Sequence, residues 1–118
     1  MALTRDEILK ADDIEIEEVE VPEWGGSVYV RGLTAEQRDQ YEQSLIVRKG
    51  KKSDINLVNA RARLVALTVV DENGDSLFTL ADAEALGQKS AAALQRVFEV
   101  AQRLSGLTEE DVEELVGN

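Results

Sequence analysis

Apolar and polar residues alternate along residues 14–31, which is the pattern of half-buried strands. Its clearest apolar positions are Val19, Val21, Val28 and Val30. Pro22 cannot donate a backbone hydrogen bond within a sheet, and Gly25–Gly26 can take the positive φ angles of a tight turn. The pattern therefore predicts a β-hairpin that closes at residues 23–27. Because the Glu17–Glu18 pair shifts the alternation, we expect either one strand with a bulge there or two short strands.

From Thr34 onward the apolar residues recur with the period of helices. One capping device, a threonine followed three residues later by an acid or amide, occurs at Thr4, Thr34, Thr79 and Thr108. It predicts helices over residues 4–11, 35–49, 80–87 and 109–116. The first of these is too short to be stable alone, so it must dock on another surface or fray.

Two more helices are expected over residues 54–69 and 91–104. The earlier one carries two adjoining apolar stripes, so it is expected to be the most buried helix of the fold. Ser90 is placed to cap the later one, and Gly106 to end it. Residues 48–53, which are basic and contain Gly50, are expected to form a flexible linker.

Together these elements predict an α+β fold, with a small N-terminal antiparallel β-hairpin or sheet followed by a helix-dominated bundle. The length of 118 residues suits one domain spanning residues 1–118. Its short helix and hairpin would occupy residues 1–33, and its helical region residues 34–118.

The chain contains no Cys and no His, so disulfides, thiolate metal sites and the commonest general base are all excluded. Acidic pairs such as Glu109–Glu110 lie on short polar segments, where surface solvation explains them better than acid–base catalysis. We therefore expect no enzyme activity, no catalytic residue, no cofactor and no metal ion.

The formal net charge of −11 is distributed unevenly. Residues 1–30 carry −7, residues 31–70 carry +4 and residues 71–118 carry −8. The acidic ends would repel nucleic acid and anionic membranes, and no apolar run is long enough to span a bilayer. The basic middle contains Arg48, Lys49, Lys51 and Lys52. It is a solvated linker, a phosphate-binding patch, or a surface that meets an acidic partner or a second copy.

Residues 71–82 have the acid spacing of a calcium-binding EF-hand loop. However, Ser76 stands where that loop needs Gly, and Asp82 stands where it needs a bidentate Glu. A polar turn whose last acid caps the next helix explains the segment better.

Two stretches resemble a known family. Residues 19–42 read V-E-V-P-E-W-G-G-S-V-Y-V-R-G-L-T-A-E-Q-R-D-Q-Y-E, and residues 71–79 read D-E-N-G-D-S-L-F-T. With the helix after Ser90, they resemble the tail assembly chaperones of long-tailed bacteriophages and prophages, and the match covers most of the chain. These motifs are structural rather than catalytic.

The resemblance implies a chaperone that binds the tape measure protein, keeps it soluble and helps recruit tail tube subunits, the last through a longer frameshifted form. It implies the cytoplasm of the bacterial host and absence from the mature virion. The alternatives are a head–tail connector or tail-end protein that stays in the particle, and an acidic DNA mimic that inhibits a host enzyme. A homo-oligomer is also open, because an unpaired strand edge favours self-association and like-charged termini oppose it.

Trp24 at the hairpin turn either covers the small core or is an exposed anchor for a partner. The candidate partner-binding residues are Trp24, Val28, Tyr29, Val30 and Tyr41. The outer face of the last two predicted helices is a second candidate surface.

Overall fold

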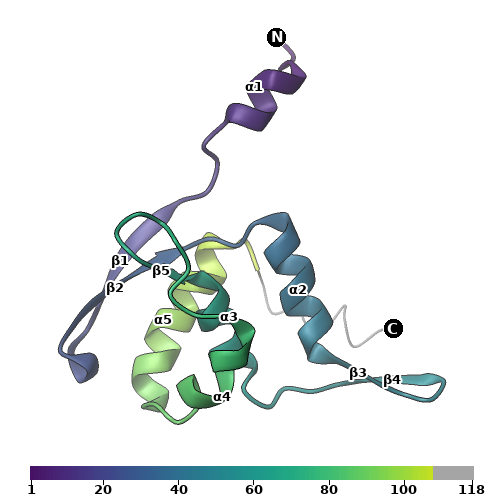
Figure 1. Ribbon diagram of the computed structural model, residues 1–118, viewed down its shortest axis with the longest axis vertical. Coiled ribbons are helices and arrows are strands. Elements are labelled where there is room, and N and C mark those ends of the chain that lie inside the picture. Colours follow the sequence, from purple (N-terminus) through teal and green to yellow (C-terminus); the bar gives the residue numbers. More distant parts are fainter. Residues whose placement is uncertain (108–118) are drawn as a thin grey trace.

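The computed structural model describes residues 1–107, in which a three-stranded antiparallel sheet packs against helices α3 and α5 (Figure 1). The helices are α1 (Arg5–Lys10), α2 (Ala35–Leu45), α3 (Ala60–Thr68), α4 (Ala83–Leu86) and α5 (Ala91–Leu104), with short 3-10 turns η1 (Pro22–Trp24) and η2 (Leu80–Asp82). The strands are β1 (Ile16–Val21), β2 (Gly26–Arg31), β3 (Ile46–Lys49), β4 (Lys52–Ile55) and β5 (Val69–Val70).

The predicted N-terminal hairpin is confirmed as β1 and β2, joined through η1 and Gly25, which has a φ of 77°. The register runs without interruption from the Ile16–Arg31 pair to the Val21–Gly26 pair. The expected bulge at Glu17–Glu18 is therefore wrong, and β1 is one regular strand. The phase shift seen in the sequence arises because Ile16, although it is in the strand, lies on the face opposite to the buried Val19 and Val21 and is 50% exposed.

The predicted helix caps are confirmed at several positions. The hydroxyls of Thr4 and Thr34 accept backbone N–H bonds from Glu7 and Gln37, whose side chains accept in return. The Asp82 carboxylate accepts the backbone N–H of Thr79 at 2.9 Å. Ser90 caps α5, and Gly106 follows it with a φ of 68°. The helix expected over residues 109–116 lies outside the described residues.

The second hairpin, β3–β4, contradicts the prediction of a helix over residues 35–49 and a flexible linker over 48–53. Helix α2 ends at Leu45, and the next residues pair as strands from Ile46–Ile55 to Lys49–Lys52. Gly50 and Lys51 form the turn, and Gly50 has a φ of 65°. Positive φ at the first of two central residues is the requirement of a type II′ hairpin turn, which Gly satisfies without steric cost.

The helix expected over residues 54–69 is shorter than predicted, since α3 begins only at Ala60. Asn59 has a left-handed φ of 57°, and Val69–Val70 leaves the helix to pair with β2 as strand β5. The prediction of a helix-dominated bundle after the hairpin is therefore wrong, although the α+β class fits. Residues 34–107 contribute three strands as well as helices.

Helix α3 is the most buried of the described helices, as predicted, with every residue from Ala62 to Thr68 buried. It contacts α5, α4 and α2, and it leads directly into the sheet through β5. The buried cluster around it draws on both long strands and on α2, α4 and α5. Whether residues 1–118 form a single domain stays a prediction.

Two ion pairs connect the β1–β2 hairpin to α5. Glu23 accepts two hydrogen bonds from Arg96, at 2.7 and 3.1 Å, and Glu17 pairs with Arg103. Arg96 and Arg103 are seven residues apart, so both lie on the same side of α5. Helix α5 consequently runs beside the β1–β2 hairpin, from the turn of the hairpin toward the open end of the hairpin.

We predict that the Glu23 carboxyl titrates below its ordinary pKa, because its hydrogen bonds with Arg96 favour the charged form. Any stability from this pair is present above the unfolded pKa and is lost as the pH falls through the lowered folded pKa. In Arg96→Gln the Glu23 pKa should return toward its ordinary value in an NMR titration. An unchanged Glu23 pKa in that variant would contradict the assignment.

Candidate functional site

A groove of about 1020 Å³ lies between α2, the first turn of α3 and α5. Its floor is apolar and includes Tyr41 and Leu45 of α2 and Leu94 of α5, all of them buried. Small residues at the ends of the helices, such as Ala60 and Ala92, also line it. A groove with an apolar floor can accept the apolar face of another helix.

The long wall of the groove is built by α5. Phe98 is half-buried there, and the Arg61 guanidinium lies over its ring at 5.8 Å from the centroid. Gln95 donates to Glu99 at 3.1 Å, so a polar edge follows the apolar wall. The groove thus combines an apolar floor with a rim of mixed charge, formed by Arg61, Lys89 and Glu99.

Burial raises the pKa of the Tyr41 phenol, and the nearby charges of Arg63 and Arg61 oppose that shift. A tyrosine phenol is neutral at physiological pH even at its ordinary pKa, so the floor of the groove carries no negative charge from Tyr41. This suits a site for apolar side chains better than a site for cations.

Arg63 links the segments next to the groove through hydrogen bonds. It is only 9% exposed, and its guanidinium donates to the carbonyls of Ser44, at 2.7 Å, Asn56, at 3.2 Å, and Val58. These carbonyls lie just before β3 and just after β4. One side chain thus fixes both ends of the β3–β4 hairpin to α3.

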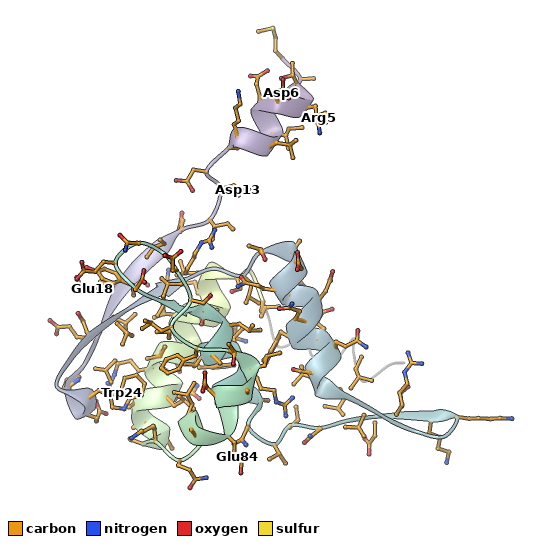
Figure 2. All side chains as sticks on the ribbon, in the orientation of Figure 1. Arg5, Asp6, Asp13, Glu18, Trp24 and Glu84 are labelled. Atoms are coloured by element: carbon orange, nitrogen blue, oxygen red, sulfur yellow. The ribbon has the colours of Figure 1, made fainter. Side chains whose placement is uncertain are left out.

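The structure places the five predicted partner-binding residues in two areas. Tyr41 is on the floor of the groove. Trp24, at the hairpin turn in Figure 2, and Val28 are half-buried and pack against the core. Val30 is fully buried in the central strand, and Tyr29 is half-buried one residue before it. Partner binding by these five residues stays a prediction.

Sequence reasoning missed the groove itself. In the sequence, Phe98 falls on the apolar face of its helix and Arg61 belongs to the basic block of residues 31–70, so neither residue signals a groove. One signal in the sequence was the pair Ala91–Ala92 at the start of an amphipathic helix. Two small residues there leave room beside the helix that longer side chains would fill. That signal is weak without knowing which helices meet.

The acidic loop at residues 71–75 is a local turn. The Asp71 carboxylate accepts the backbone N–H groups of Asn73, at 2.8 Å, and Asp75, at 3.0 Å, and Gly74 has a φ of 85°. Across this loop Val70 bridges to Ser76, and Leu77 donates to the Val69 carbonyl. Within residues 1–107, no group of three or more potential ligand side chains is positioned to hold a metal ion.

Comparison with known proteins gives the class of this protein. The family model described as phage tail assembly chaperone matches residues 5–115. This chain therefore belongs to the phage tail assembly chaperone family, which confirms the resemblance. The family is described by a chaperone role and not by a reaction.

A solved structure shows the same fold. The tail assembly chaperone of bacteriophage HK97 superposes with a TM-score of 0.59 at 16% sequence identity, covering 84% of this chain and 94% of that one. No curated protein matches the sequence. Among the described helices, none has the length and apolar character needed to cross a bilayer.

Proposed function

We propose that this protein binds helical segments of the tape measure protein in the groove between α2, α3 and α5. The observation that carries the proposal is a groove of about 1020 Å³ with a neutral, apolar floor in a member of the tail assembly chaperone family. An amphipathic helix docks in such a groove through apolar residues spaced three and four apart. Binding there covers the client's apolar face, which keeps the client soluble before assembly.

The remaining parts of the proposal follow from the same role. The protein acts in the cytoplasm of the bacterial host, and it leaves before the virion is complete. Tail tube subunits gather on the bound tape measure protein, recruited through a longer frameshifted form of the chain. The acidic character of the chain, with its net charge of −11, opposes aggregation of the loaded complex.

Ala92→Glu is expected to weaken tape measure binding by about tenfold or more, since it places a charge against the client's apolar face. Ala92 is exposed and lies in the first turn of α5, where a carboxylate is compatible with the helix dipole. The fold should therefore be retained. Binding is measured by titrating the protein against a purified tape measure segment of the same phage, and chaperoning by light scattering of that segment.

Ala85→Glu is the matched control, because Ala85 is also exposed, lies on α4 and does not line the groove. Wild-type affinity in the Ala92→Glu variant would place the client elsewhere, and the hairpin residues Trp24 and Tyr29 would be tested next. Stoichiometric amounts of this chain in mature virions would contradict the chaperone role and favour a connector.

A further inference from the structure

The groove between α2, α3 and α5 has a long axis, and α5 sets its direction. Ala91, Gln95, Phe98 and Gln102 line the groove at spacings of three and four residues, so they form one row along a single side of the helix. From Ala91 to Gln102 the helix rises about 17 Å, or about three turns. By comparison, the part of α2 that lines the groove spans a single turn. An occupant helix therefore finds its longest wall in α5 and lies along it.

The two ends of the groove differ in charge. Lys89, an exposed side chain just before α5, lines the end where the helix dipole is positive. Glu99, also exposed, lines the half of the groove toward the C-terminal, negative end of α5. Among the side chains that the structure describes, neither has an oppositely charged partner. Arg61 lies over Phe98, the residue before Glu99, and offsets part of the Glu99 charge, so the positive end at Lys89 is the stronger one.

The fold itself leaves apolar surface in the groove uncovered. Leu57, which precedes α3, is 61% exposed, and Phe98 on α5 is only half-buried. A helix seated along α5 covers both side chains, and covering apolar surface is favourable whichever way the helix points. Apolar contact thus gives the client its affinity without giving it a direction. The direction has to come from the charges at the two ends.

We propose that the groove holds the client helix in one direction, antiparallel to α5. The C-terminal end of the client, where its helix dipole is negative, lies at Lys89, and its N-terminal end lies beside Glu99 and Gln102. This direction rests on the proposed function, because the groove is the client site in both, and it adds how the client is oriented there. A fixed direction makes the two ends of the bound client different, so a later partner can distinguish them.

A client helix fits the groove better than a helix from a second copy of this chain. Among the described helices, α2, α3, α4 and α5 all bury residues in their own molecule. Helix α1, which stands apart from the other helices in Figure 1, buries none. Its six residues rise about 9 Å, roughly half the length of the row on α5. The occupant therefore needs a free amphipathic helix of about 11 residues or more.

Cysteine cross-linking tests the direction, because the chain contains no cysteine and each introduced thiol is the only one present. Ala91→Cys places a thiol at the Lys89 end of the groove, and Gln102→Cys places one at the other end. The client is a peptide of about 12 residues from an amphipathic segment of the tape measure protein of the same phage. It carries one cysteine at its N- or its C-terminus, and both termini are blocked so that they add no charge.

Ala91→Cys is expected to cross-link the C-terminal cysteine of the client about tenfold faster than the N-terminal one, and Gln102→Cys should show the opposite preference. Lys89→Glu with Glu99→Lys exchanges the charges of the two ends and keeps the net charge of −11. In that background both preferences should be lost or reversed. Disulfide formation is followed by mass spectrometry, and circular dichroism establishes that every variant is folded.

Ala85→Cys is the control, since Ala85 is exposed on α4 and does not line the groove. Equal rates for the two client ends, the reverse preference, or preferences that persist after the charge exchange would each overturn this proposal and leave the groove as the client site. Cross-linking of Ala85→Cys as fast as that of Ala91→Cys would contradict the groove, and the proposed function with it. Cross-linking between copies of the chain that excess client does not suppress would show a second copy in the groove and would likewise overturn both.

Discussion

Arg63→Met is expected to lower the free energy of unfolding by about 3 kcal/mol. Methionine retains an apolar stem of similar length but cannot donate to the carbonyls of Ser44, Asn56 and Val58. Hydrogen bonds from a charged donor stabilise a fold more than neutral ones do, and the variant loses all three of them. The effect is measured by urea denaturation followed by circular dichroism.

Arg61→Met is the matched control on the same helix. Arg61 is exposed, and its contact with the Phe98 ring at 5.8 Å is worth about 0.5–1 kcal/mol at such a site. If both variants lose the same stability, Arg63 is not the residue that anchors the β3–β4 hairpin. Proteolysis between Arg48 and Lys52 gives a second readout, since a released hairpin should be cleaved faster in Arg63→Met.

Gly32→Ala is expected to destabilise the protein by about 2–3 kcal/mol. A Cβ atom at this position would lie 2.7 Å from the carbonyl oxygen of Leu104, which is backbone and cannot rotate away. Gly32 is the point where the chain leaves β2 and passes the end of α5, and Leu33 next to it donates to the Ser105 hydroxyl. An added methyl group must push the sheet and α5 apart.

Gly26→Ala tests whether the effect is due to close approach or to losing a glycine. Gly26 is exposed in β2, and a Cβ there meets nothing within 4 Å. We expect its free energy of unfolding to stay within about 0.5 kcal/mol of wild type. Similar melting curves for the two alanine variants would show that the packing of Gly32 against Leu104 is not tight.

Local signals in the sequence predicted the elements that are determined locally. The caps at Thr4, Thr34 and Ser90 depend on residues within three positions, and the alternation of Val19 and Val21 reports one buried face. The family could also be recognised, because the hairpin and the helix after it lie close together in the sequence.

The elements that were predicted wrongly depend on competition between local preferences. Ile46 and Val47 prefer strands, yet the capped helix before them obscured the change at Leu45. Gly50–Lys51 fits a two-residue hairpin turn, but its charged neighbours made it resemble a solvated linker. Strand β5 is only two residues long, and its pairing with β2 comes from tertiary contact rather than from a pattern.

The groove could not be predicted for the same reason. Its floor joins Tyr41, Leu45 and Leu94, which come from two helices separated by about half the chain. Taken within its own helix, each of these residues has the position of an ordinary core residue. Their common surface appears only once α2 and α5 are placed beside α3.

The order of strands in the sheet has a consequence for synthesis on the ribosome. β2 is central, and the neighbour on one of its sides is β5, which follows it by more than thirty residues. A nascent chain that has emerged only as far as α2 therefore displays an open β2 edge with unpaired amides and carbonyls. That edge closes when Val69 and Val70 emerge, so stalled or truncated translation products ending before them should be far more prone to misassembly than the finished chain.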